Sequence, residues 1–459
     1  MSGVLGAPGF PEAVIRSRAR EGAAGAFPPM DGYGLTLFGA GGTGGVPQPA
    51  APHGADVLDA MRLVPPVFMP QRLEKLTDLA REPLYGDVEL ATDIGGFRSS
   101  LPVYVSAFGS TQVASSGLGL AASRQAGRLG IPLVIGENVV PTNGFADGSA
   151  GSPEDRSTGS PEERSTGSPG DRSADSSADT GDSMLARLRA YEQELPEGMG
   201  GLAFQQSTED ADAEVWNQIY SAPAAKALLE SGRLAFELKV GQGAKPGLGG
   251  MTVLKRSVAD QLAAQYSTDE NVFGSGHDRV LRSSSPGTFT AEILRQQIRF
   301  MRNNYPRARI WVKLPPGRDI REAAAVARES GADSVTVDGA EGGSGWAPSS
   351  FLDQVGLPLG ECLRRLEPRS SSDCLLVSGR MWEGARAVKA LALGARAVGL
   401  GRAALLAADE DPQDGIARLV SCLAFELRLL ISALGKYTPA ALGPEDVWLP
   451  GTADPHLHP

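Results

Sequence analysis

The sequence VSGRMWEGARAVKALALGARAVGLGR, residues 377–402, contains two short apolar strands that each end in a glycine and an arginine. The first strand stops at Gly379 and Arg380 and the second at Gly401 and Arg402, each before a helical pattern. Glycine lets a ligand approach a helix start, where backbone N–H groups and the helix dipole favour anions. We therefore predict a phosphate-binding anion site at these four residues, as expected after strands seven and eight of a (β/α)8 barrel. An ordinary βαβ unit with surface arginines is the alternative.

Six further apolar segments upstream have the length and composition of buried strands, and helical patterns separate most of them. Together with the two strands above they make eight. This arrangement predicts an α/β fold of the parallel (β/α)8 (TIM) barrel class. The six upstream segments are residues 101–107, 131–136, 202–206, 234–240, 309–314 and 334–338.

The barrel is expected to occupy residues 61–435. A Gly-, Pro- and Ala-rich segment, residues 1–60, is expected to form an irregular N-terminal arm, and residues 436–459 a C-terminal tail. The acidic tract 147–183 is rich in Ser, Pro, Gly and Asp, with an imperfect repeat, and cannot bury enough apolar surface to order itself. We expect it to be a disordered loop insertion. Residues 241–288 are interpreted as a long glycine-rich excursion.

Bulk composition limits the classes of function. The chain has 459 residues, 41% of them hydrophobic, and a formal net charge of −11, which argues against nucleic acid or an anionic membrane as the main partner. Three cysteines, Cys362, Cys374 and Cys422, have no paired spacing, so neither disulfides nor a metal site is expected. No signal peptide or apolar stretch of about 18 residues is found. We expect a soluble, cytoplasmic protein.

Residues just after the barrel strands are expected to form the active site. Lys313 ends an apolar strand and would point into the barrel mouth, where a buried ammonium needs an anionic or polar partner. The N1–C2=O edge of a flavin is one such partner, and a salt bridge with Glu237 or Asp338 is the alternative. The glycines Gly342 and Gly343 after strand six could approach a ribityl chain or a phosphate.

Two charged residues are candidates for substrate chemistry. Lys245 lies between glycines in a kinked loop over the mouth of strand four, which suggests a cation for a substrate carboxylate. A solvated loop lysine is the alternative. Glu137 follows strand two and is the best-placed carboxylate for holding an ammonium or shuttling a proton.

The segment GQGAKPGLGG, residues 241–250, resembles the FMN-binding domain of the glutamate synthase family, and the resemblance extends over about residues 68–435. The resemblance implies FMN in the barrel mouth, its phosphate at the anion site, the Ala107–Phe108 backbone near flavin N5 and Lys313 near N1. It further implies a 2-oxoglutarate-type substrate at Lys245. The remaining predicted contacts are Ser106, Gln206, Gly342, Gly343 and Ser378 for the cofactor, and Gln242 and Met251 for the substrate.

The sequence also departs from that family. The cysteines of its iron–sulfur centre are missing after strand eight, and no glutaminase or NAD(P)H domain is recognised. Met251 stands where the family has a substrate-contacting glutamine, and Ala340 where it has a histidine. Residues 283–289 replace its proline–histidine stretch. We therefore do not expect a complete glutamate synthase.

The leading hypothesis is an FMN-dependent oxidoreductase acting on a C–N bond of an amino acid or an imine-forming small molecule. This hypothesis requires a carboxylate-bearing substrate. It also requires a second redox partner, which is an electron donor, an electron acceptor or oxygen. The chain could form a homo-oligomer. A 2-hydroxy-acid oxidase is an alternative, although His277 is the sole histidine that could reach the site. A flavin-dependent isomerase is another, because Trp346 follows the glycine run as in such enzymes. A flavin subunit that needs a partner chain is the third.

Overall fold

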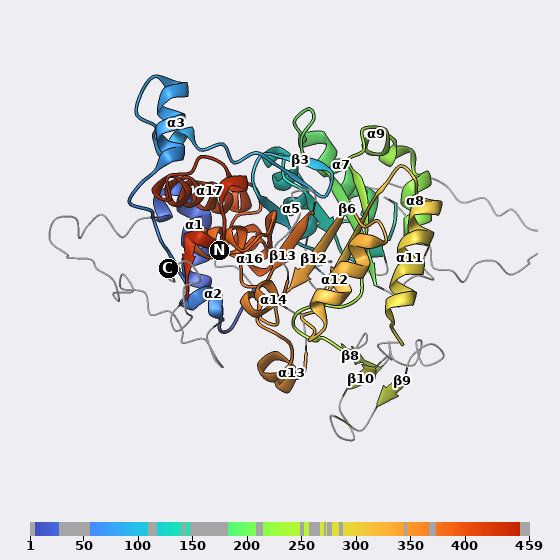
Figure 1. Cartoon of the computed structure of the whole chain (residues 1–459). Coiled ribbons are helices and arrows are strands. Elements are labelled where there is room, and N and C mark those ends of the chain that lie inside the picture. The colour runs from blue at the N-terminus through green and yellow to red at the C-terminus, as the bar shows by residue number, and fades with distance from the viewer. Residues whose placement is uncertain are drawn as a thin grey trace, which may run out of the picture.

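The eight predicted strands form a closed parallel barrel in the computed structural model (Figure 1). The structure describes residues 5–26, 56–108, 117–137, 139–140, 144–146, 182–207, 214–247, 252–256, 267–269, 272, 278–283, 288–343, 347–366 and 373–449. The strands follow each other around the barrel in chain order, which confirms the predicted fold class. They are β4 (Val103–Val105), β5 (Leu133–Ile135), β6 (Leu202–Ser207), β7 (Leu234–Lys239), β11 (Arg309–Leu314), β12 (Ser334–Asp338), β13 (Leu375–Ser378) and β14 (Ala397–Leu400).

Helices surround the barrel, as the periodic apolar patterns between the strands predict. Because strand side chains alternate, one set packs outward against these helices and the other fills the barrel interior. In the described residues no helix is long and apolar enough to cross a membrane. The barrel helices are α5 (Leu118–Leu129), α7 (Met184–Glu194), α8 (Val215–Ser221), α9 (Lys226–Glu230), α11 (Ala291–Asn304), α12 (Ile320–Glu329), α13 (Ser349–Gln354), α14 (Leu359–Arg365), α15 (Gly384–Ala392), α16 (Arg402–Glu410) and α17 (Gly415–Ala433).

A β-hairpin of β2 (Thr92–Ile94) and β3 (Phe97–Ser99) closes the amino end of the barrel. The indole N–H of Trp311 donates to the carbonyl oxygen of Gly95 over 2.9 Å, and its ring lies 5.2 Å from that of Phe97. Gly95 has φ 56°, and a Cβ there would lie 2.4 Å from Trp311 Nε1, so the turn requires glycine. We call the interior residues above this hairpin the lower layer: Tyr104, Val134, Ala203, Ala235, Trp311, Leu376 and Ala397.

The N-terminal arm is not irregular where the structure describes it. Helix α1 (Glu12–Glu21) packs against α16 and α17. Arg18 pairs with Glu426 at 2.5 Å and Arg16 with Asp409 at 2.8 Å. These partners lie about 400 positions away, so local sequence could not predict the helix. After it come α2 (Val57–Ala60), β1 (Arg62–Leu63) and α3 (Pro70–Leu79).

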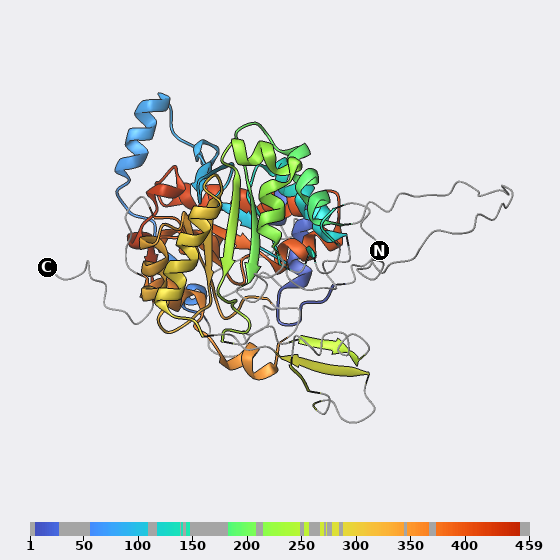
Figure 2. The ribbon, with the colours of Figure 1, turned by 90° about the vertical axis from the view of Figure 1, so that its right-hand side faces the viewer.

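Three other regions contain structure that the sequence did not predict. The glycine-rich excursion contains an antiparallel sheet of β8 (Thr252–Lys255), β9 (Ser267–Asp269) and β10 (Arg279–Ser283), which Figure 2 shows beyond the ends to which β6 and β7 point. Within the tract 147–183, Asp182 and Ser183 lie directly before α7: Ser183 caps the helix by accepting from the Ala186 N–H, and Asp182 pairs with Arg187. Residues 436–449 pack back onto the protein, because β15 (Val447–Trp448) pairs with β1 in an antiparallel sheet.

Candidate active site

Polar side chains face the barrel interior at the carboxyl ends of the strands, and we call them the mouth layer. Strand alternation places most of them two residues after a lower-layer residue, as Lys313 follows Trp311 and Ser378 follows Leu376. The lower layer thus supports the site directly. The mouth layer comprises Ser106, Gln205, Glu237, Lys239, Lys313, Thr336, Asp338 and Ser378.

Lys313 and Asp338 form a buried ion pair at the ends of β11 and β12, with 3.3 Å between Nζ and Oδ2. Burial lowers the pKa of Lys313, but the carboxylates of Asp338 and Glu237 outweigh it and raise that pKa above its usual value. Burial opposes ionisation of Asp338 as well, yet Lys313 and the Ser378 hydroxyl, 2.6 Å from Oδ1, hold its pKa below the usual range. The salt bridge between Lys313 and Asp338, the alternative in the sequence analysis, is therefore present.

Glu237, the mouth-layer residue two positions before Lys239 on β7, is 1% exposed. It accepts hydrogen bonds from Nε2 of Gln205 and, over 3.0 Å, from Oγ1 of Thr336. Burial raises its pKa, and Lys313 offsets part of that rise. Gln206 was the predicted cofactor contact on β6, but Gln205 is the side chain that meets Glu237. Gln206 is buried at the same strand end, and its cofactor contact stays a prediction.

Glu137, the predicted catalytic carboxylate, follows β5 and pairs with Lys239 at the end of β7. Burial opposes its ionisation, but Lys239 keeps its pKa below the usual value. Its Oε2 atom is buried and has no hydrogen-bond partner among the described residues, a condition that costs about 1–3 kcal/mol. A donor from a substrate would satisfy it. The sequence analysis missed Lys239, although alternation along β7 places it on the same face as Glu237.

The loop at residues 241–247 lies over the mouth layer because glycine permits close backbone contact. The N–H of Gly243 donates to Oδ2 of Asp338 over 3.0 Å, and a Cβ on Gly243 would lie 1.9 Å from the Gly339 carbonyl oxygen. Gln242 and Lys245 in this loop are half-buried at the same end of the barrel. Met251, the third predicted substrate contact, lies outside the described residues.

The predicted anion site lies where β13 and β14 end. Nη2 of Arg402 donates to the Glu341 carbonyl oxygen over 2.6 Å, and the guanidinium lies 4.4 Å from the ring centroid of Phe10. Burial and the neighbouring Arg380 lower the pKa of Arg402. Within the described ranges no carboxylate forms an ion pair with Arg402, whereas Arg380 pairs with Asp59 at 2.8 Å.

The glycines around Arg402 leave room beside it. A Cβ on Gly401 would meet no described atom within 4 Å. A Cβ on Gly343 would lie 2.7 Å from Cγ of Arg402, so glycine lets the arginine pass close to this backbone. The N–H of Gly342 donates to the Gly339 carbonyl oxygen over 2.9 Å, which fixes the turn after β12.

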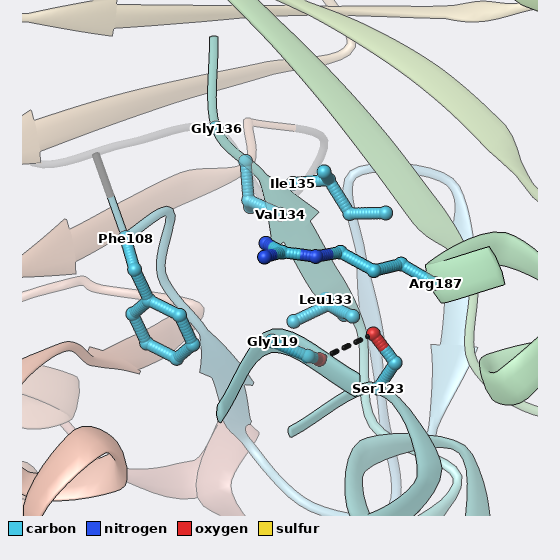
Figure 3. Close-up of a pocket in the computed structure, with 8 residues that line it drawn as sticks. All are labelled: Phe108, Gly119, Ser123, Leu133, Val134, Ile135, Gly136 and Arg187. Carbon is cyan, nitrogen blue, oxygen red and sulfur yellow. Dashed lines mark hydrogen bonds between the residues drawn. The ribbon is translucent and has the colours of Figure 1, made fainter. Parts of the chain in front are cut away.

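The predicted contacts after β4 lie apart from each other. Ser106 faces inward, and its hydroxyl is buried without a hydrogen-bond partner in the part of the chain that the structure describes. Ala107 is half-buried. The ring of Phe108 instead lines a small pocket between β5 and helices α5 and α7, opposite the guanidinium of Arg187 (Figure 3). Its side chain therefore packs in the outer core, and only its backbone stays a candidate for a flavin contact.

Two charged residues beside the anion site, Arg386 on α15 and Asp59 on α2, were also missed. Arg386 pairs with Asp59 at 2.8 Å. More than 320 positions separate the two residues, so no local sequence signal could have revealed the pair.

In parallel (β/α)8 barrels the active site lies at the carboxyl ends of the strands, where this barrel has its polar mouth layer. Residues 187–410 match the family model described as "Conserved region in glutamate synthase". The resemblance to the glutamate synthase family that the GQGAKPG loop indicated is thereby confirmed for this part of the chain.

Individual relatives agree with that match. An archaeal-type glutamate synthase [NADPH] of Dehalococcoides mccartyi is 33% identical over 186 residues, which cover 39% of this chain and 36% of the relative. A glutamate synthase large subunit-like protein of Rhizobium meliloti is 35% identical over 186 residues, 39% of this chain and 40% of the relative. The matched segments thus span well under half of these relatives.

Among solved structures, a soluble mutant of the membrane-associated (S)-mandelate dehydrogenase of Pseudomonas putida superposes with a TM-score of 0.51. The alignment covers 86% of this chain and 88% of that one, at 17% identity. Similarity at this identity concerns the fold alone.

Proposed function

We propose that the chain is an FMN-dependent oxidoreductase that acts on a carbon–nitrogen bond of an amino acid or an imine-forming small molecule. The single observation that carries the proposal is the buried Lys239–Glu137 pair beside the Lys313–Asp338 pair. Lys239 presents an ammonium at this end of the barrel, and Glu137 presents a carboxylate oxygen that has no partner among the described residues.

The residues present fit FMN. Arg402 is a half-buried cation beside an open glycine and a helix start, a combination suited to a phosphate. The unpartnered hydroxyl of Ser106 can donate to a polar ring edge or accept from one. Together these groups match a ligand with a phosphate at one end and a polar ring at the other. When bound, FMN would exchange a hydride with the substrate carbon.

Lys313 is suited to hold negative charge at the ring edge. Its ammonium is fixed by Asp338, and the two nearby carboxylates keep its pKa high, so it stays protonated at neutral pH. Because the cation is buried, it would stabilise a developing anion more strongly than a solvated lysine would.

An amino acid carries one carboxylate and one ammonium, and the mouth layer offers a partner for each. Lys239, with Lys245 from the loop above, would bind the carboxylate. Oε2 of Glu137 would accept a hydrogen bond from the substrate nitrogen and hold or return its proton. Since Lys239 holds the pKa of Glu137 below its usual value, this carboxylate would meet the substrate nitrogen as an anion.

Anaerobic mixing of the FMN-loaded protein with amino acids one at a time tests this proposal. We expect one amino acid to bleach the visible flavin absorbance, and Glu137→Gln to slow the bleaching by about 100-fold. Glu230→Gln, an exposed change on α9, is the matched control. Bleaching that is equally fast in the Glu137→Gln variant would refute the role of Glu137. Turnover without bleaching, after prior reduction of the flavin, would instead support the isomerase alternative.

A further inference from the structure

Arg386 is a buried arginine on α15 that binds the backbone of the anion site from behind. Its Nε donates to the carbonyl oxygen of Gly379 over 3.3 Å. Its other nitrogens pair with Asp56 at 2.6 Å, with Asp59 at 2.8 Å and with Glu341. The Arg386 side chain is 2% exposed, and Asp56 is the most deeply buried of its three carboxylate partners.

The contact at Gly379 fixes an unusual turn. Gly379 has φ 132° and Arg380 has φ 55°, a left-handed conformation that costs a non-glycine residue about 1 kcal/mol. Surrounding contacts must therefore hold the turn in place. Arg386 supplies one of them from one side, and the pairing of Arg380 with Asp59 at 2.8 Å supplies another.

The N-terminal segment supplies the two aspartates of this cluster. Asp56 caps α2 by accepting from the Leu58 N–H, and it also accepts from the Gly360 N–H over 2.9 Å. Helix α2 therefore packs against α14 and α15. Asp59 on the same helix reaches both Arg386 and Arg380. An element that lies far outside the strands of the barrel thus shapes its anion site.

The cluster divides the three arginines into two groups. Arg386 pairs with Asp56, Asp59 and Glu341, and Arg380 pairs with Asp59. Arg402 instead donates to a carbonyl oxygen, and its guanidinium lies over the ring of Phe10. The guanidinium of Arg402 forms no ion pair with any described carboxylate, so it could bind an anion at the strand ends directly. The guanidinium of Arg380 would first have to break its ion pair with Asp59.

We propose that Arg386 and Asp59 are positioning residues for the anion site, and that the side chain of Arg402, rather than that of Arg380, binds the phosphate. In this arrangement Arg380 contributes its backbone to the turn, and its guanidinium stays on Asp59. The inference rests on the proposed function, because the phosphate is that of FMN.

Equilibrium titration of the apo-protein with FMN and with riboflavin, which lacks the phosphate, tests the inference. Arg402→Gln should weaken FMN binding by about tenfold or more, the loss of a charge-assisted hydrogen bond, and Arg380→Gln by about threefold or less. Arg386→Lys keeps the charge but loses the planar fork, and should weaken FMN binding by about fivefold. Riboflavin affinity should stay constant in all three variants. Arg364→Gln, at an exposed pair on α14, is the control.

The outcomes separate the inference from the proposed function. If the wild-type protein takes up neither flavin, both fail. If it binds FMN but Arg380→Gln loses as much affinity as Arg402→Gln, the assignment to Arg402 fails alone. If Arg386→Lys weakens riboflavin and FMN equally, Arg386 is merely structural and the positioning role is wrong. Thermal unfolding of each variant identifies a loss of affinity that comes from misfolding.

Discussion

The lower layer and the mouth layer of the barrel differ completely in chemistry although they lie two residues apart on the same strands. Trp311 is wholly buried among apolar neighbours and makes one hydrogen bond, to the hairpin turn at Gly95. Lys313 lies about 6–7 Å further along β11, in a network of two carboxylates, an amide and hydroxyls. The closed amino end stabilises the barrel, and the carboxyl end places charge where a ligand can meet it.

This contrast shows that the mouth layer is maintained at a cost in stability. Buried charges must be desolvated, and their mutual attraction offsets that loss only when every group is paired. The lower layer carries no such requirement. Substitutions in the two layers should therefore separate stability from ligand binding.

The largest effect is expected from Lys313→Met, which removes the cation and keeps the volume. Asp338 and Glu237 would stay buried without it, and the free energy of unfolding should fall by about 3–5 kcal/mol. Urea unfolding measures the change, with Lys226→Met at an exposed site on α9 as control. A loss below about 1 kcal/mol would mean that the mouth-layer charges are solvated rather than buried.

Gly95→Ala tests the lower layer. The added Cβ would meet the Trp311 indole at 2.4 Å in a left-handed turn, so we expect a loss of about 1–3 kcal/mol in unfolding free energy. Gly86→Ala, whose Cβ would meet no described atom within 4 Å, is the control. Flavin affinity of the folded variant should be unchanged. A weaker flavin complex would show that the two layers are not separable.

The pH dependence of stability should come from the carboxyl end of the barrel. Burial raises the pKa of Glu341 from 4.5 to about 8; the Arg386 guanidinium opposes this rise, and the nearby Asp56 adds to it. A carboxyl whose folded pKa is raised contributes stability that is complete below its unfolded pKa and is lost as pH rises through the folded value. The free energy of unfolding should therefore decline between about pH 4.5 and 8, and Glu341→Gln should remove that decline. An unchanged slope in the variant would assign the titration to another group.

The smallest effect concerns the Asp59–Arg380 pair, which is partly exposed. A double-mutant cycle of Asp59→Asn and Arg380→Gln should give a coupling energy of about 0.5–1 kcal/mol. Additive effects on unfolding would mean that the pair does not hold the turn, and would remove one support of the positioning role.

The sequence predicted the barrel strands well because each is a short apolar run bounded by glycine, proline or polar residues. The bounds of β11 and β12 match the expected ones, and the polar residues at the strand ends indicated Lys313, Ser378 and Arg402 as candidates. Lys239 could have been found too, since alternation from Glu237 leads directly to it.

Other features were beyond a local pattern. Helix α1 is held by ion pairs with residues about 400 positions away, and the Arg386 cluster joins α2 to α15 across more than 320 positions. The sheet of β8, β9 and β10 depends on pairing between short strands with no strong alternation. The sequence pattern therefore indicated which residues lie at the strand ends. It could not indicate which of them form ion pairs, because those pairs join residues far apart in the sequence.

Equilibrium dialysis of the purified chain against FMN, followed by identification of the bound chromophore, tests the central claim most directly. The account predicts one FMN for each chain, bound more tightly than riboflavin, with the visible spectrum altered by Lys313→Met. A chain that remains colourless at saturating FMN would contradict it. The polar mouth and the anion site would then have to serve a different ligand.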